Sequence, residues 1–143
     1  MSYSYRHRVA FFETDAMGVV HHSNYIRFME LARVDWLRGV GVMDLHIPHG
    51  DHVLGVLNAS VEFKKPCRFD DEIEIFVEGR IKGARLWIRY AIWLEKVGVW
   101  VATGETELAL LTADRLQPTR FSRDFVSRLE ATPLSQHWPP ARD

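Results

Sequence analysis

The sequence predicts an α+β fold in which a five-stranded antiparallel sheet wraps around one long central helix. Three observations lead to this prediction. One stretch repeats apolar residues at helical spacing, five stretches read as strands, and the turns between the later strands are short. A sheet with one apolar face needs a cover, and a single amphipathic helix can supply it.

The first elements are a strand, a loop and the helix. Residues 5–12 alternate from side to side with aromatic and branched side chains, which predicts a strand. Residues 13–20 break the alternation and predict a loop. Ser23 or Asn24 is the expected N-cap of the helix, because either side chain can accept a hydrogen bond from the free amides of a helix start.

The helix has one apolar face and a clear end. Steps of three and four residues define the inward face, which comprises Tyr25, Phe28, Met29, Ala32, Trp36 and Leu37. Glu30 is expected close to this face. Gly39 and Gly41 predict the C-terminal stop.

Four further strands are expected after an irregular connection at 42–52. They cover residues 53–65, 71–82, 84–96 and 97–113. The segment 86–94 is apolar or aromatic on both sides, which predicts a central strand or an interface. Gly104 is expected at a bulge or bend. A last helix at 121–129 with Ser122 as its cap is followed by residues 133–143, which are expected to form a frayed tail.

Composition narrows the classes of protein. With 143 residues, 47% hydrophobic and 26% charged, we expect one domain over 1–143 with its core at about 5–113. The net charge of −1 gives no support for binding nucleic acid or anionic membranes. No apolar run is long enough for a bilayer span, and no secretory signal is evident. The single cysteine, Cys67, predicts a buried thiol without a disulfide and a cytoplasmic protein.

The loop and the helix start hold the residues with chemical potential. Asp15 precedes the helix, whose free amides and partial positive charge can stabilise an oxyanion. Gly18 lets the backbone approach a ligand closely. A carboxylate beside such amides can activate water or attack a carbonyl directly. The residues therefore suit hydrolysis of an ester or thioester.

Plainer interpretations compete with this one. Asp-x-x-Gly is also a common turn, and Ser23 lacks the setting of a hydrolase nucleophile. His21 and His22 are adjacent on a turn and are expected to point apart, which argues against a metal pair. The remaining candidate metal ligands, His46, His49 and His52, are expected to be solvated loop residues. No metal and no cofactor is therefore expected.

The stretch from Phe12 to Tyr25, FETDAMGVVHHSNY, carries the motif Asp-x-x-Gly-x-Val-x-His-x-x-Tyr. It resembles the hotdog-fold acyl-CoA thioesterases of the 4-hydroxybenzoyl-CoA thioesterase type, and most closely their branch found with the Tol-Pal system. The sequences FKKP at 63–66 and DDEI at 70–73 are also similar to this family. The resemblance covers residues 5–113 and implies a hotdog fold and hydrolysis of an acyl-CoA.

The resemblance also implies roles for individual residues. Asp15 matches the catalytic carboxylate, as nucleophile or general base. His22 matches a second catalytic position, whose backbone amide polarises the thioester carbonyl. Gly18, Val19 and Tyr25 match positions that line or support the substrate site.

The family builds its site at a subunit interface, which implies a homodimer or homotetramer. The coenzyme A phosphates need cations, and Lys64, Lys65 and Arg85 are the candidates, together with Arg80 and Lys82 near the same strand ends and hairpin. Two alternatives stay open. The chain could be a non-catalytic acyl-CoA or acyl-carrier binding module, or a hotdog dehydratase or hydratase.

Overall fold

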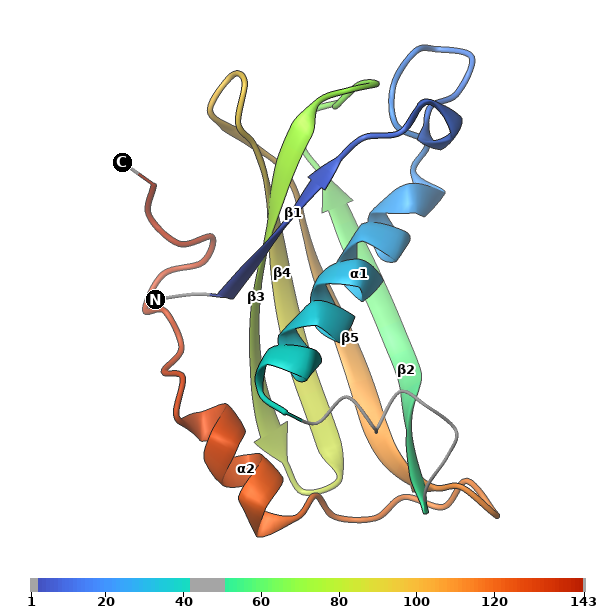
Figure 1. Cartoon of the computed structure of the whole chain (residues 1–143), viewed down its shortest axis with the longest axis vertical. Helices are drawn as coiled ribbons and strands as arrows, with labels where there is room; N and C mark the ends of the chain where they lie inside the picture. The colour runs from blue at the N-terminus through green and yellow to red at the C-terminus, as the bar shows by residue number, and fades with distance from the viewer. Residues whose placement is uncertain (1–2, 42–50, 143) are drawn as a thin grey trace.

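The computed structural model describes residues 3–41 and 51–142, which form a five-stranded sheet with helices on it (Figure 1). The elements in chain order are β1 (Tyr3–Arg8), the 3-10 turn η1 (Phe11–Glu13), α1 (Ser23–Gly39), β2 (His52–Phe63), β3 (Glu72–Lys82), β4 (Arg85–Leu94), β5 (Val99–Thr112) and α2 (Arg123–Glu130). The order of elements therefore follows the sequence prediction. None of the helices in the described ranges is long and apolar enough to cross a membrane.

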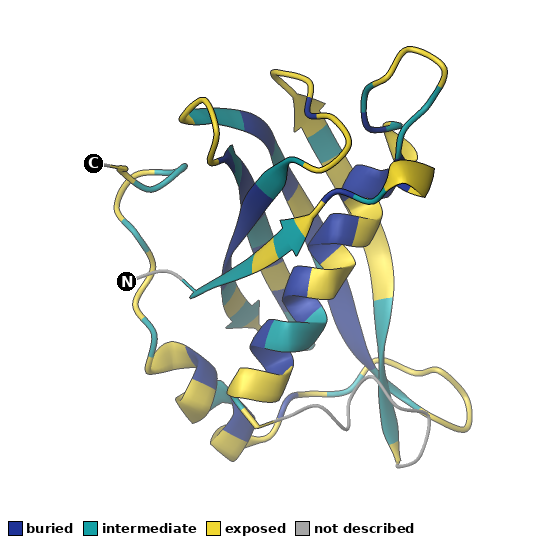
Figure 2. Cartoon of the chain, turned by 45° about the horizontal axis from the view of Figure 1, so that its top comes forward, coloured by how far each residue is buried: buried dark blue, intermediate teal, exposed yellow. Residues whose placement is uncertain are grey.

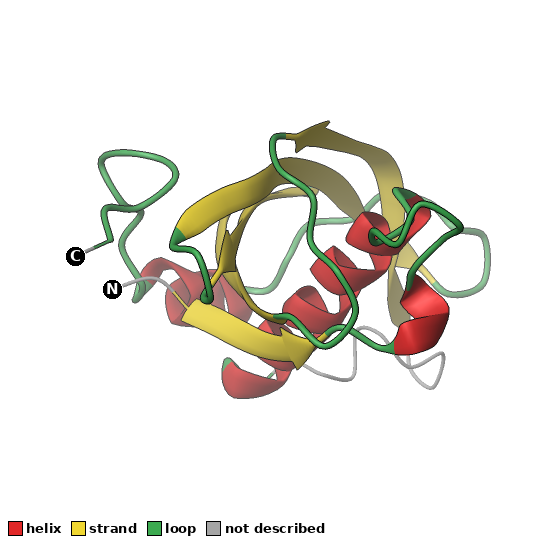
Figure 3. Cartoon of the chain, turned by 90° about the horizontal axis from the view of Figure 1, so that it is seen from above, coloured by secondary structure: helices red, strands yellow, loops and turns green. Residues whose placement is uncertain are grey.

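The strands lie in the order β1-β3-β4-β5-β2, and every neighbouring pair is antiparallel. The strand β4 is in the middle, which confirms the central position predicted for 86–94. The sheet curves, and α1 lies along its concave side (Figure 3). The two outer strands of this sheet are β1 and β2.

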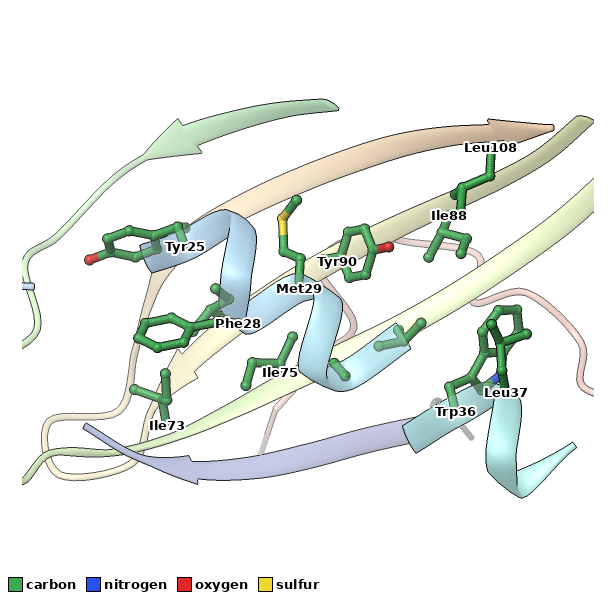
Figure 4. Close-up of a cluster of buried hydrophobic side chains, with 14 of the residues drawn as sticks. Tyr25, Phe28, Met29, Trp36, Leu37, Ile73, Ile75, Ile88, Tyr90 and Leu108 are labelled. Carbon is green, nitrogen blue, oxygen red and sulfur yellow. The ribbon is translucent and has the colours of Figure 1, made fainter. Parts of the chain in front are cut away.

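The predicted inward face of α1 is buried against the sheet (Figure 2, Figure 4). Two glycines make this approach close. A Cβ at Gly79 of β3 would collide with the Trp36 ring, and one at Gly104 of β5 would collide with Met29. Gly104 was predicted at a bulge or bend, and the bulge is wrong, since the register shifts lie between Val56 and Asn58 and where Ile92 and Trp93 pair with β5. Gly104 leaves room for the helix instead.

The single long helix of the prediction is only part of the cover. The 17 residues of α1 give a length of about 26 Å, whereas the 14 residues of β5 extend over about 46 Å. The short helix α2 adds its buried Phe125 and Leu129 to the same hydrophobic core. The Ser122 hydroxyl accepts from the Phe125 amide at 3.1 Å, so the predicted cap of α2 is confirmed.

Two local predictions differ from the structure. The first strand ends at Arg8, because the chain turns into η1 where the Glu13 carboxylate accepts a hydrogen bond from the Ala10 amide at 2.7 Å. Glu30 is exposed, since two helical steps of 100° turn it away from buried Phe28.

The C-terminal segment 133–142 is packed on the outer face of the sheet, so the prediction of a frayed tail is wrong. The Arg142 guanidinium lies 3.2 Å from the Glu74 carboxylate of β3. The Arg89 guanidinium of β4 lies 4.4 Å from the centre of the Trp138 ring. Opposite charges and a cation–π contact hold this segment on the sheet.

Candidate active site

The loop between η1 and α1 is a small hairpin. Thr14 and Val20 form an antiparallel bridge, and the Asp15 amide donates to the Val19 carbonyl at 2.9 Å. Gly18 has a φ of +77°, a left-handed conformation that a side chain would disfavour. The turn conformation therefore accounts for a glycine at this position of the motif, as the close approach of a ligand would.

Asp15 is half-buried at the tip of this hairpin. Its Oδ1 accepts a hydrogen bond from the Met17 amide at 2.8 Å, and its carbonyl accepts one from the Gly18 amide at 2.9 Å. The second oxygen, Oδ2, has no hydrogen bond to another described residue. The carboxylate is therefore oriented by the turn and has one oxygen left for a ligand or water.

Glu13 anchors the base of the hairpin, a role that sequence reasoning missed. Its side chain is buried, and Oε1 lies 2.9 Å from Nε2 of His7 on β1. Its carbonyl accepts from the His21 amide at 2.9 Å and from the Asn24 side chain at 2.8 Å. One residue therefore ties the strand, the loop and the helix start together.

The N-cap position of α1 is His22, whose side chain makes no capping hydrogen bond, so the prediction of Ser23 or Asn24 as the N-cap is wrong. The Ser23 amide donates to the ring Nδ1 of His21 at 3.2 Å, and the Ser23 hydroxyl lies 2.8 Å from the same atom. The Asn24 side chain is buried on Glu13 instead. A histidine in this position carries no sequence signal for capping, which is why the ring was overlooked.

The amide of His22 remains without an acceptor in the described part of the chain. The neighbouring amides are all used, because His21 donates to Glu13, Ser23 to the His21 ring, Asn24 to the His21 carbonyl and Tyr25 to the His22 carbonyl. A free amide at a helix start is a ready donor to an oxyanion.

A shallow cavity of about 280 Å³ is lined in part by His22. Its lining brings together four of the predicted site residues with three apolar neighbours, namely Val20, His22, Tyr25, Phe63, Lys64, Lys65 and Pro66. Asp15, Gly18 and Val19 lie on the adjacent hairpin and do not line the cavity.

Tyr25 lines this cavity with a side chain that is otherwise buried. Its hydroxyl lies 3.4 Å from the Cys67 thiol, and both side chains are buried. Burial raises the pKa of Tyr25, so its hydroxyl stays protonated near neutral pH and does not serve as a base. The predicted buried thiol of Cys67 is confirmed.

The cations proposed for coenzyme A do not form one cluster. Lys64 and Lys65 follow the end of β2, where both amides bond to the Val101 carbonyl. Arg85 begins β4 and pairs with Glu107 at 3.2 Å. The sheet register places Arg85 about eight residues, or roughly 26 Å, from the level of Lys64. Arg80 and Lys82 lie at the same distant end of β3.

The two adjacent histidines lie side by side and do not point apart. Their ring centres are 4.1 Å from each other, because the His21 ring folds back toward the Ser23 amide and lies next to the His22 ring. No group of three potential metal ligands occurs among the residues that the structure describes. His46 and His49 lie outside those residues, and His52 begins β2.

An antiparallel sheet curved around one helix, with a carboxylate-bearing hairpin leading into that helix, defines the hotdog class of thioesterase-like proteins. A family model described as Thioesterase-like superfamily matches residues 9–129. The chain belongs to this superfamily.

Curated relatives and solved structures agree with this assignment. A putative esterase from Aquifex aeolicus is 45% identical over 75 residues, which cover 52% of this chain and 59% of the relative. A 1,4-dihydroxy-2-naphthoyl-CoA hydrolase from Thermosynechococcus vestitus is 30% identical over 132 residues, covering 90% and 89%. The crystal structure of a DHNA-CoA thioesterase from Staphylococcus aureus superposes with a TM-score of 0.82 at 26% identity, covering 91% of each chain.

Proposed function

We propose that the chain hydrolyses acyl-CoA thioesters, with one water consumed, to the free acid and coenzyme A. The observation that carries this proposal is His22, a residue that lines a cavity next to the Asp15 hairpin and whose amide has no acceptor in the described structure. Such an amide can stabilise the negative charge that develops on a thioester carbonyl under attack. The named activity of the relatives supports this chemistry.

The proposed reaction uses water as the only co-reactant. In the general-base route, Asp15 takes a proton from water while the water oxygen bonds to the carbonyl carbon. The carbonyl oxygen becomes an oxyanion that accepts from the His22 amide. The carbon–sulfur bond then breaks, and the departing thiolate takes up a proton. In the nucleophilic route, the Asp15 carboxylate attacks the carbonyl carbon and the carbon–sulfur bond breaks, so that the coenzyme A thiolate leaves and takes up a proton. Water then hydrolyses the mixed anhydride, which releases the acid and restores the Asp15 carboxylate.

Further residues are assigned to binding. Lys64 and Lys65 lie at the cavity mouth, where their charges suit the phosphates of coenzyme A. Arg85 lies far from the cavity and is paired with Glu107. We propose that it takes part in coenzyme A binding only if a second copy of the chain brings it near the cavity. Gly18, Val19 and Tyr25 are proposed to shape the site.

A second copy of the chain is proposed to complete the site. Large apolar side chains are exposed along the edge strand β2 and on α1, namely Val56, Leu57, Phe63, Ile26 and Leu31. Exposed apolar surface of this kind is typical of protein–protein interfaces. We therefore propose a homodimer or a homotetramer, which measurement of the molar mass in solution would test. A buried reduced cysteine suits the reducing cytoplasm that we propose as its location.

The decisive experiment measures thiol release from short-chain, long-chain and aromatic acyl-CoAs. Turnover of at least one substrate, with acid and coenzyme A formed in equal amounts, is expected. Tight binding with no thiol released from the whole panel would replace the proposal with a binding module. Hydration of an enoyl thioester without free thiol would favour a hydratase.

A further inference from the structure

One arginine of α1, Arg33, is buried and lies away from the proposed reaction centre. Arg33 is only 7% exposed, and its side chain faces Tyr90 of β4. Arginine is one of the residues least often buried unless it is paired. Its surroundings are therefore informative.

Arg33 has little compensation for its charge. Its Nη1 reaches the Tyr90 hydroxyl at 3.5 Å, the limit of a hydrogen bond, and its Nε is buried without an acceptor. Within the described ranges, no carboxylate lies in ion-pair distance of it. The Tyr90 hydroxyl is itself 2.7 Å from Thr106 Oγ1.

Tyr90 does not act as the missing anion. It is completely buried, and burial raises the pKa of Tyr90, so the phenol stays neutral. A buried guanidinium facing neutral hydroxyls is unfavourable, because an unpaired charge in the interior costs several kcal/mol. A leucine or methionine would fill the same place without this cost. The position therefore calls for an anion that arrives with a ligand.

One side of α1 connects the residue that lines the cavity with Arg33. Tyr25, which lines the cavity, Met29 and Arg33 follow one another at steps of four residues along one side of α1. The axial distance from Tyr25 to Arg33 is about 12 Å. In Figure 4, Met29 lies between Tyr25 and Tyr90. Methionine is a flexible filler, and its thioether can move aside for a chain.

We propose that Arg33 binds a carboxylate at the far end of the acyl group, so that the preferred substrates are coenzyme A monothioesters of dicarboxylic acids. A carboxylate matches the guanidinium in charge and in its two-pronged geometry. The Thr106 and Tyr90 hydroxyls lie next to the same place. This inference rests on the proposed thioesterase function and specifies its substrate class.

Matched pairs of substrates test the inference. Suberoyl-CoA and octanoyl-CoA share a chain length and differ in the terminal carboxylate, and adipoyl-CoA with hexanoyl-CoA gives a shorter pair. The wild type is expected to show a higher kcat/KM for the carboxylated member of at least one pair. Arg33→Met should lower that ratio roughly 10- to 100-fold, the effect of losing a hydrogen-bonded charge. Arg33→Lys should retain part of it.

Arg27→Met is the matched control, because Arg27 is an exposed arginine on the same helix. Its substrate ratio should equal that of the wild type. A wild type that favours neither carboxylated substrate overturns the inference even if Arg33→Met does not fold. An unchanged ratio in a folded Arg33→Met protein also overturns it. Absence of thiol release from every substrate would instead refute the thioesterase function itself, so the two failures are distinguishable.

Discussion

The Asp15 carboxylate accepts a hydrogen bond from the Met17 amide at 2.8 Å, through the same side chain that the motif assigns to catalysis. This contact closes the turn at the tip of the hairpin, and Gly18 completes it with a positive φ. Removal of the side chain would therefore disturb the loop as well as any chemistry. A useful variant must keep the acceptor oxygen and lose only the charge.

Asp15→Asn meets this condition, because the amide oxygen of asparagine can accept from the Met17 amide in the same way. We expect the melting temperature to stay within a few degrees of the wild type and kcat for acyl-CoA to fall by about 10²-fold or more. Thiol release and thermal unfolding measure the two quantities. A folded variant with near-normal turnover would remove Asp15 from the mechanism.

His22 offers a test of a backbone amide. Its φ of −54° is within the range of proline, and the first turn of a helix tolerates proline. His22→Pro should therefore delete the free N–H at little cost in stability, while His22→Ala deletes only the ring. We expect kcat to fall by about 10²- to 10³-fold for proline and by less than about 10-fold for alanine. Equal kinetics for the two variants would contradict the oxyanion assignment.

The regular elements were predictable because their signals are local. Helical spacing from Tyr25 to Leu37 reflects the burial of one face, and alternation in β3 and β4 reflects a sheet with one face inside. The ends of elements were less predictable. The turn after Arg8 depends on Glu13, and the start of α1 depends on a histidine ring, so both are decided by side-chain contacts that no propensity encodes.

Glu13 is expected to contribute to stability without taking part in the reaction. Glu13→Ala leaves the Ala10 amide and the His7 ring without their acceptor, and we expect a loss of about 1–3 kcal/mol in the free energy of unfolding. Urea denaturation measures this loss. Glu13→Gln keeps an acceptor oxygen and should lose clearly less, and an alanine variant as stable as the wild type would show that the anchor is unimportant.

The outer face of the sheet should depend on Glu78. This buried carboxylate accepts from Arg89 Nη2 at 2.7 Å and from the Ser135 amide at 2.9 Å, so it joins β4 to the C-terminal segment. Glu78→Ala is expected to cost about 2–3 kcal/mol and to make residues after 132 more sensitive to protease.

The control for this prediction is Glu105→Ala. Glu105 is exposed and lies opposite Arg89 in the neighbouring strand β5. Its removal should change the free energy of unfolding by no more than about 0.5 kcal/mol. If both variants lose the same free energy of unfolding, the contact between Glu78 and the C-terminal segment stabilises the protein no more than an exposed glutamate does.

The candidate site was predictable in part. The motif from Asp15 to Tyr25 pointed to the hairpin and the helix start, and the cavity beside His22 includes Lys64 and Lys65. Arg85 could not be placed from the sequence, because only the strand register shows that it begins β4 at the far end. Arg33 was missed for a related reason, since an arginine within a helix usually points to water.

The burial of Cys67 makes this chain convenient for chemical labelling. Its thiol is the only one in the sequence, it is fully enclosed beside Tyr25, and burial raises the pKa of Cys67. Native protein should therefore consume almost no chromogenic disulfide reagent, and the colour developed during turnover counts coenzyme A alone. The chain is also a near cysteine-free background. A single Glu30→Cys substitution on the exposed side of α1 would give one reactive handle for a fluorophore or spin label.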